Sequence, residues 1–444
     1  MSPAPRRASM QPLSWQEWKL VLLLSTINFV HILDFVIVMP LGDQLSEELS
    51  LNPAEFGFVV SAYGLMATLA GILSAMVSDR LNRRNIMLVM LAGFTLGTLY
   101  CGLSKGYLHL VLARALAGGC GGVIASTIMS FVVEMIPESR RGRAIGIVTS
   151  SFAFASTIGL PIGLTLANYF GRFGAPFIAI AVLAVAMTTV CFFLLPNLPG
   201  RQVQPDHSTL RQFGKVLSHS NHLWSFIFML VMVLGTFMIV PFIAPYLEAN
   251  CDLARTNLPL IYFVGGICTL IAMNFIGWLT DRFGPRPVFI IAASSALVLT
   301  VIITNLPPIS LPVAILTTTA FMCAASSRVV PAQAMMLRSA QPAARGAFTS
   351  LNTAVSHLAT GIAPMITGAL MGRPIENGPY TGYWLAGLVA ICFGGSAIVL
   401  SFFLKPAIEP PQTTLLKEDA KELPTDEQVT EEAELATACG DPVS

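Results

Sequence analysis

Long apolar stretches alternate with short polar ones along most of this chain, and this pattern predicts an all-helical membrane protein. A run of roughly 20 apolar residues spans a bilayer as a helix, because a helix satisfies its backbone polar groups internally. The runs lack the two-residue alternation of barrel strands, which excludes a β-barrel. Twelve runs are present, namely Trp18 to Leu41, Phe56 to Val77, Ile86 to Gly102, Leu108 to Met135, Ala144 to Ala167, Pro176 to Leu195, Leu223 to Leu247, Leu258 to Leu279, Val288 to Leu306, Leu311 to Leu337, Phe348 to Met371, and Tyr383 to Leu404.

The longest internal polar stretch separates six expected helices from six others. It covers residues 197–222 and has Pro199, Gly200 and Pro205 near its start, which is typical of a linker. We therefore expect an N-terminal segment (1–17), a six-helix bundle (18–196), a central linker (197–222), a second six-helix bundle (223–404) and a tail (405–444). The tail is rich in acidic residues and has no apolar face, so we expect it to be disordered.

Arginines predict the orientation of the chain. The hairpins after the second, fourth, eighth and tenth runs hold ten of them, whereas the opposite hairpins hold four basic residues, Lys105, Arg172, Arg255 and Arg373. The positive-inside rule places the arginine-rich hairpins and both termini in the cytoplasm. The ten arginines are Arg80, Arg83, Arg84, Arg140, Arg141, Arg143, Arg282, Arg286, Arg338 and Arg345.

The amino-acid composition limits the classes of protein to which the chain can belong. Only 11% of residues are charged and 54% are apolar, which is typical of a polytopic membrane protein. The sequence contains no phosphate-binding glycine loop, so we expect work to draw on an ion gradient rather than on ATP. Eight cysteines lie scattered without a C-x-x-C pair, and neither a disulfide framework nor a metal site is expected. We expect no nucleic-acid binding and no enzymatic activity.

Two similar polar hairpins lie about 200 residues apart and indicate an internal duplication. Ala75-Met-Val-Ser-Asp79-Arg80-Leu-Asn82-Arg83-Arg84 follows the second run, and Gly277-Trp-Leu-Thr-Asp281-Arg282-Phe-Gly284-Pro-Arg286 follows the eighth. Pro161 recurs as Pro364 at the same spacing. Each half of the chain is therefore expected to be one copy of a six-helix unit.

These hairpins resemble the signature loop of the major facilitator superfamily, G-x-L-x-D-[RK]-x-G-[RK]-[RK]. The first copy matches it at Asp79, Arg80, Arg83 and Arg84, with Ala75 and Asn82 in place of its glycines, and the second keeps Gly277, Leu279, Asp281, Arg282 and Gly284. The resemblance covers about Trp18 to Leu404. It implies two six-helix bundles around a central site that is reached alternately from each side of the membrane.

Three further stretches are similar to the twelve-helix drug:proton antiporters and the sugar-efflux permeases. The stretches are Leu33-Asp34-Phe-Val-Ile-Val-Met-Pro40, Leu110-x-x-x-Arg114-x-x-Ala117-Gly118 and Gly159-Leu-Pro161-Ile-Gly163, with Ala117 where the pattern has Gln. The resemblance implies a monomer in a plasma membrane of bacterial inner-membrane type. It implies proton-coupled export of a small organic molecule, and proton-coupled uptake and a non-transporting receptor remain as alternatives.

Five ionisable residues lie within the runs, away from their ends: His31, Asp34, Arg114, Arg328 and His357. Burying such a group at mid-bilayer costs on the order of 2.5 to 3.5 kcal/mol, so we expect each of the five to have a functional or structural role. Asp34 and Arg114 both lie roughly 9 to 12 Å from the outer surface, which allows them to pair. Arg328 and His357 share a depth near the midplane.

We hypothesise that Asp34 is the proton site, that Arg114 holds it ionised, and that Arg328 positions an anionic or hydroxyl-rich substrate group. The resemblance implies that the helices carrying Asp34, Arg114 and Arg328 line the central cavity. The alternative is that Asp34 and Arg114 form a static pair between two helices. His31 and His357 are weaker candidates, because a histidine in a membrane helix often just hydrogen-bonds across helices.

The hairpin residues form a second candidate site. The resemblance implies that Asp79 caps the inner end of the Phe348–Met371 helix and that Arg83 pairs with Glu134. With Arg80, Arg84, Asp281 and Arg282 they would form a cytoplasmic gate; the alternative is a charge cluster that only sets topology. Gly159, Pro161 and Gly163 permit close packing or a bend, or alternatively help to set transport direction.

Overall fold

The structure is a computed structural model that describes residues 13–77, 81–198, 209–341, 345–372 and 378–406 of the 444-residue chain. Nearly all of these residues are helical. Within the described ranges the extended backbone is limited to one isolated bridge between Gly372 and Thr381. The all-helical fold class expected from the sequence is confirmed.

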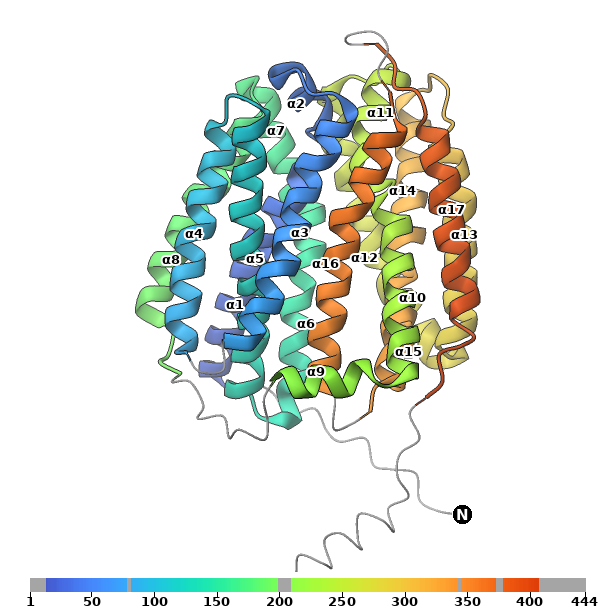
Figure 1. Ribbon diagram of the computed structural model, residues 1–444. Helices are drawn as coiled ribbons and strands as arrows, with labels where there is room; N and C mark the ends of the chain where they lie inside the picture. The colour runs from blue at the N-terminus through green and yellow to red at the C-terminus, as the bar shows by residue number, and fades with distance from the viewer. Residues whose placement is uncertain (1–12, 78–80, 199–208, 342–344, 373–377, 407–444) are drawn as a thin grey trace, which may run out of the picture.

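The N-terminal half forms one bundle (Figure 1). Its helix α1 begins after Ser14, whose side chain and that of Glu17 form a reciprocal capping box. Helix α4 begins after Asn82, whose side chain accepts a hydrogen bond of 3.0 Å from the Arg84 backbone N–H. The helices are α1 Trp15–Ile37, α2 Gly42–Leu49, α3 Pro53–Val77, α4 Arg83–Leu103, α5 Tyr107–Met135, α6 Glu138–Phe154, a π-helical segment Ala155–Gly159, α7 Leu160–Phe170 and α8 Gly174–Leu194.

The C-terminal half forms a second bundle beside the first (Figure 1). The range expected to be a linker contains the short helix α9, and α10 begins at Ser220. The helices are α9 Thr209–Leu217, α10 Ser220–Phe237, a 3₁₀ turn Val240–Phe242, α11 Ile243–Asn250, a 3₁₀ turn Arg255–Asn257, α12 Leu258–Phe283, α13 Pro285–Ile303, α14 Leu311–Ser327, α15 Val329–Ser339, α16 Arg345–Leu370 and α17 Tyr383–Leu400.

Eleven continuous or composite helices in the described ranges are long and apolar enough to cross a membrane. Helix α16 is more polar, but it is 26 residues long and runs alongside the others (Figure 1). The expected continuous run Leu311 to Leu337 is interrupted at Arg328, between α14 and α15. Pro331 has no backbone N–H to bond the Ser327 carbonyl, which explains the interruption.

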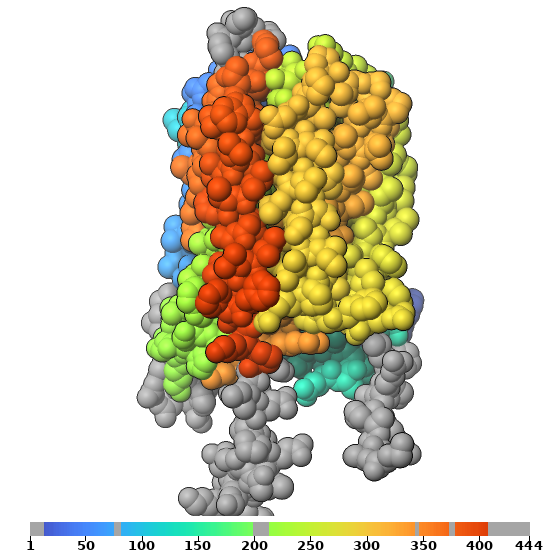
Figure 2. All heavy atoms as spheres, turned by 90° about the vertical axis from the view of Figure 1, so that its right-hand side faces the viewer, coloured from blue at the N-terminus to red at the C-terminus, as the bar shows by residue number. Residues whose placement is uncertain are grey.

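The outer surface of the bundles is apolar. Figure 2 shows α13 and α17 packed side by side along the height of the molecule. Large side chains on these two helices are exposed, including Ile291, Val298, Val301, Trp384, Leu388 and Val399. A contiguous exposed surface of this kind is unfavourable in water and suits the hydrocarbon core of a bilayer.

The two halves meet closely near one end of the molecule, which we call the capped face because α2 and α11 cover it (Figure 1). Phe56 of α3 packs edge-on against Phe242, with ring centroids 5.3 Å apart. Phe35 of α1 and Phe237 of α10 lie 6.0 Å apart. These contacts join residues of opposite bundles.

The other end of the molecule, where α9 lies, is called the open face (Figure 1). Helix α12 is buried between Leu258 and Gly266 near the capped face, and in the rest of its length only Thr280 is buried. Helix α6, at the open face, buries only three of its residues, Ala144, Val148 and Ser151. The two bundles are therefore in closer contact at the capped face, where α12 packs against α7 and the π-helical segment, than at the open face.

Close backbone contact between α3 and α16 depends on glycine. A Cβ added to Gly64 would lie 2.7 Å from the backbone nitrogen of Gly361, so a side chain there must push the two helices apart. We predict that Gly64→Ala lowers the free energy of unfolding by about 1 to 3 kcal/mol, the usual cost of overpacking. Thermal unfolding of the purified protein in detergent would measure this.

Gly71→Ala is the matched control for that prediction. Gly71 lies on the same helix, and a Cβ there would meet nothing within 4 Å. The Gly71→Ala variant should unfold no earlier than the parent protein, because alanine favours a helix over glycine. Equal unfolding temperatures for the two variants would contradict the proposed packing role of Gly64.

Candidate functional site

Asp34 and Arg114 form an ion pair inside the N-terminal bundle, and the side chains of both are completely buried. The Nη1 atom of Arg114 donates to Oδ2 of Asp34 at 3.1 Å and to the Asp34 carbonyl at 2.9 Å. Its Nη2 atom donates to the Phe35 carbonyl at 3.3 Å, and its guanidinium carbon lies 4.5 Å from the centroid of the Tyr63 ring. The ion pair that the matched depths of Asp34 and Arg114 allow is therefore present in the structure.

The end of α1 makes these carbonyls available. The Val38 N–H turns back to the Val36 carbonyl, so the Asp34 carbonyl is not taken up by the helix. The last carbonyls of any helix lack partners within it and need them elsewhere. Arg114 supplies the missing donors and thereby ties α5 to the end of α1.

The ion pair leaves polar atoms unsatisfied. Oδ1 of Asp34 lies beside the Thr98 hydroxyl without a well-formed hydrogen bond to it, and Nε of Arg114 and the Tyr63 hydroxyl have no hydrogen-bond partner. A carboxylate and a guanidinium can form two parallel hydrogen bonds, and this pair forms one. One carboxylate oxygen therefore remains outside the ion pair, beside the Thr98 hydroxyl, where it can take a proton.

His31 lies one turn before Asp34 on α1 and is 7% exposed. Its ring lies 6.3 Å from that of Tyr63 and 6.5 Å from that of Phe94, and neither of its nitrogens is hydrogen-bonded. His357 lies on α16 of the opposite bundle, where its backbone carbonyl accepts a hydrogen bond of 2.8 Å from the Thr360 hydroxyl. The structure thus places His31 one turn from Asp34 on the same helix.

Arg328 lies apart from this group, at the break between α14 and α15, and is 4% exposed. Its Nη2 atom donates to the hydroxyl of Thr236 on α10, and its Nε atom has no partner. The shared depth predicted for Arg328 and His357 is not accompanied by a hydrogen bond or ion pair between them in the described structure.

Those of the predicted gate residues that the structure describes lie at the open face. Both Nε and Nη2 of Arg83 lie 3.0 Å from Oε1 of Glu134, which holds the start of α4 against the end of α5 within one bundle. Arg84 donates to the Phe192 carbonyl.

Asp79 and Arg80 lie outside the described residues. Asp281 and Arg282 end helix α12, where the Arg282 guanidinium lies 5.3 Å from a Trp278 ring centroid.

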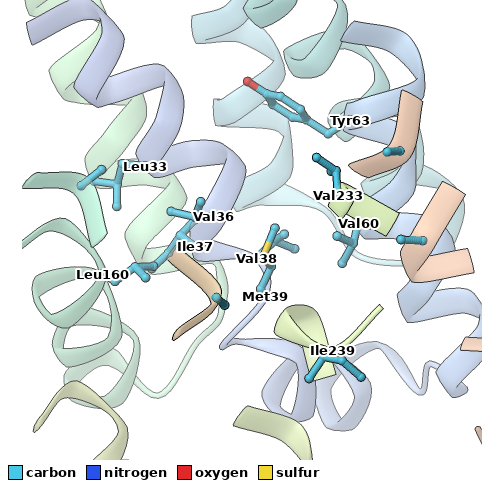
Figure 3. Close-up of a cluster of buried hydrophobic side chains, with 14 of the residues drawn as sticks. Leu33, Val36, Ile37, Val38, Met39, Val60, Tyr63, Leu160, Val233 and Ile239 are labelled. Carbon is cyan, nitrogen blue, oxygen red and sulfur yellow. The ribbon is translucent and has the colours of Figure 1, made fainter. Parts of the chain in front are cut away.

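The glycines around Pro161 lie against α1, close to Asp34. A Cβ at Gly159 would come within 2.8 Å of Leu33, and one at Gly163 within 2.6 Å of Ile37. Figure 3 shows Leu33 and Ile37 in the same buried cluster as Leu160. Gly159 ends the π-helical segment, and Pro161 lies in the first turn of α7. The motif permits close helix packing at this point.

An ion-pair cluster at the capped face was not found from the sequence. Arg255 lies 2.7 Å from Glu248, 2.9 Å from Glu47 and 3.4 Å from Asp43. Asp43 and Glu47 belong to α2 of the first bundle, whereas Arg255 and Glu248 belong to the second. We call these four residues the capped-face lock. From the sequence Arg255 is expected only to be a topological charge, although the spacing of Asp43 and Glu47 places both acids on one side of a helix.

In the part of the chain that the structure describes, no three metal-ligating side chains come together and the cysteines are unpaired. Two surface hollows, of about 520 and 490 Å³, lie near the ends of the molecule and contain none of the five buried candidates. The buried polar groups are therefore ion pairs and single ionisable groups between helices.

Two bundles of membrane-length helices that pack most closely at one face are the architecture of a membrane transporter. A family model described as Major Facilitator Superfamily matches residues 24–327 and 226–437. The chain belongs to this superfamily, and it is accordingly a multi-pass membrane protein that handles small-molecule substrates.

Similar proteins include transporters named for different substrates. The chain is 24% identical to the multidrug resistance protein MdtG of Proteus mirabilis over 357 residues, 76% of this chain and 84% of that protein. It is 22% identical to a probable sugar efflux transporter of Pasteurella multocida over 239 residues, 54% of this chain and 58% of that protein. An uncharacterized MFS-type transporter of Bacillus subtilis, YceJ, is 23% identical over 360 residues, 81% of this chain and 90% of that protein.

Solved structures share the fold. A bacterial homolog of the human lysosomal transporter Spinster, inward-facing and unoccupied, superposes with a TM-score of 0.71 at 16% identity, covering 88% of this chain and 98% of that one. A D-xylose-proton symporter superposes with a TM-score of 0.70 at 15% identity, covering 88% of this chain and 98% of the symporter chain. At these identities the likeness shows the fold alone.

The capped-face lock should hold the two bundles together. Its ion pairs are partly exposed and worth a fraction of a kcal/mol each, so we predict that Arg255→Gln weakens closure by about 1 to 2 kcal/mol in total. The maleimide labelling rate of a cysteine at buried Val60 should then rise about 5- to 30-fold. Labelling in membranes would measure this.

Arg172→Gln is the matched control. Arg172 is an exposed arginine that follows α7 at the same face and forms no ion pair in the described structure. Its replacement should leave the labelling rate at position 60 unchanged. Equal rates for the Arg255 and Arg172 variants would show that the lock does not hold the capped face closed.

Proposed function

We propose that the protein is a proton-coupled secondary transporter that exports a small organic molecule from the cell by alternating access. The observation that carries the proposal is the fully buried Asp34–Arg114 pair, whose carboxylate keeps one oxygen outside the ion pair. Ionisable groups at such depth are costly and mark proton or substrate pathways in membrane proteins. The driving force would be the proton gradient.

Charge distribution supports a cytoplasmic open face. The arginines Arg83, Arg140, Arg282 and Arg338 lie at helix ends on that side, whereas the capped face carries few basic residues and several acids. The positive-inside rule favours this orientation, with both termini in the cytoplasm of a bacterial-type inner membrane. The conformation described above would then be inward-facing.

In this proposal the proton and the substrate compete. When Asp34 is ionised it holds Arg114 by a charge-assisted hydrogen bond, and protonation removes the charge that Arg114 compensates. The guanidinium would then turn to other acceptors, and α1 and α5 would be less tightly tied. Helix α1 also carries His31 and packs against the Gly159–Gly163 motif. A movement of α1 on protonation of Asp34 would therefore be passed on to the interface between the bundles.

In this proposal the capped face and the open face would each be closed by its own set of contacts. At the capped face, Arg255 of one bundle binds acids of the other, and outward opening must break those pairs. At the open face the hairpin from Asp79 to Arg84 would close the cytoplasmic gate, with the Arg83–Glu134 pair holding it in position. Asp281 and Arg282 would serve the corresponding hairpin of the second half.

Proton-coupled uptake is the second candidate. The fold shared with the D-xylose-proton symporter supports it, because one buried carboxylate serves either direction. The names of the multidrug and sugar-efflux relatives favour export. The two differ in whether substrate moves against the proton flow or with it.

We predict that Asp34→Asn abolishes substrate-driven proton movement. Asparagine keeps the shape but cannot take up and release a proton. Proteoliposomes loaded with a pH-sensitive dye would report proton flux when sugars, amphiphilic cations or organic anions are added.

Asp252→Asn makes the same chemical change at an exposed acid outside the helices and should retain full flux. Unchanged flux in the Asp34 variant would exclude Asp34 as the coupling group. Binding without proton movement in the parent protein would favour facilitated diffusion or a receptor.

A further inference from the structure

Arg328 is a buried cation whose donors are largely unused. A guanidinium carries five N–H donors, and Arg328 makes one hydrogen bond, to the neutral hydroxyl of Thr236. It forms no ion pair with any described residue, although it is 4% exposed. A charge in this position is costly unless another group supplies acceptors and an opposite charge.

The duplicated half of the same chain shows what is missing. At the spacing that relates Asp79 to Asp281, Asp34 of α1 corresponds to Thr236 of α10. In the first bundle Arg114 binds a carboxylate at this position, and in the second Arg328 binds a hydroxyl there. At the same spacing Arg114 corresponds to Leu316, so the second bundle brings an arginine from a different sequence position to a place where the acid is absent.

Thr236 lies on the face of α10 that points to the interior. Leu223, Trp224 and Ile227 form its exposed outer face. Thr236 follows Ile227 by nine residues, about two and a half helical turns, which places it on the opposite side. It is nevertheless partly exposed, so the Arg328–Thr236 pair borders accessible space rather than sealed core.

Nearby acids do not supply the counter-charge. The described part of the second bundle holds three carboxylates, Glu248, Asp252 and Asp281, and all three lie toward the ends of the molecule. Asp34 is committed to Arg114. The remaining ionisable groups between the bundles, His31 and His357, add either no charge or more positive charge. The interior therefore carries one uncompensated positive charge.

We propose that Arg328 is a binding site for an oxyanion group of the substrate, so that the transported molecule is an organic anion carrying a carboxylate or a phosphate. Both groups match the planar fork of a guanidinium through paired hydrogen bonds. An amphiphilic cation finds no unpaired carboxylate at this depth. This inference rests on the proposed transport function and names the substrate class of its central site.

Matched ligand pairs test the charge preference directly. The thermal stability of the purified protein would be measured with glucose 6-phosphate against glucose, with benzoate against benzamide, and with tetraphenylphosphonium as the cation. We expect at least one anion to stabilise the protein more than its neutral counterpart. Stabilisation by glucose, benzamide or the cation alone, or by none of the anions, would overturn the proposal.

Variants then locate the site. Arg328→Gln should weaken binding of the stabilising anion about 10- to 100-fold, because hydrogen bonds to a charged group are lost. Arg328→Lys keeps the charge without the fork and should lose less. Arg338→Gln, at an exposed arginine at the end of α15, is the control and should bind as the parent does. Equal anion affinity in the parent and Arg328→Gln proteins would overturn the assignment.

The Asp34→Asn variant separates this inference from the proposed function. If the parent binds the anion through Arg328 but moves no protons, proton coupling fails and the anion site stands. If a neutral or cationic compound drives proton movement that requires Asp34, coupling stands and the anion site fails. Since the charge preference is measured on the unmodified protein, a variant that does not fold leaves that result intact.

Discussion

The buried pair of Asp34 and Arg114 is the interaction on which the first bundle depends. It ties the end of α1 to α5 where the last carbonyls of α1 have no helical partner. Removing one member would leave the other charged and isolated at full burial, which is strongly destabilising. The same residues thus hold two helices together and provide an ionisable group between them.

Contact between the two bundles depends on close backbone packing at glycines rather than on a buried ion pair. Near the capped face α3 and α16 approach through Gly57, Gly64, Gly361 and Gly368, whose missing side chains let the backbones touch. Small residues serve this purpose in membranes because lipid gives no hydrophobic drive for helices to associate. The capped-face lock adds ionic contacts to the same end, while the open face has no comparable closure in the described residues.

Sequence patterns predicted the all-helical fold class, and the structure buries His31, Asp34, Arg114 and Arg328 within helices or at their junctions. The third expected helix, Ile86 to Gly102, is observed as Arg83–Leu103. The pairing of Arg83 with Glu134 and of Asp34 with Arg114 followed from the family resemblance and from depth along a helix. The capped-face lock did not follow, because Asp43 and Arg255 are more than 200 residues apart and neither lies in a conspicuous motif.

The sequence by itself therefore determined that the chain forms membrane-length apolar helices and which charges lie within them, since bilayer thickness and backbone hydrogen bonding leave few other solutions. The tertiary structure decided which charges meet. It paired Arg114 with a carboxylate, left Arg328 with a hydroxyl, and brought Arg255 to the acids of the other bundle. Side-chain pairing across helices depends on helix rotation and tilt, which are set by packing and are not encoded in depth alone.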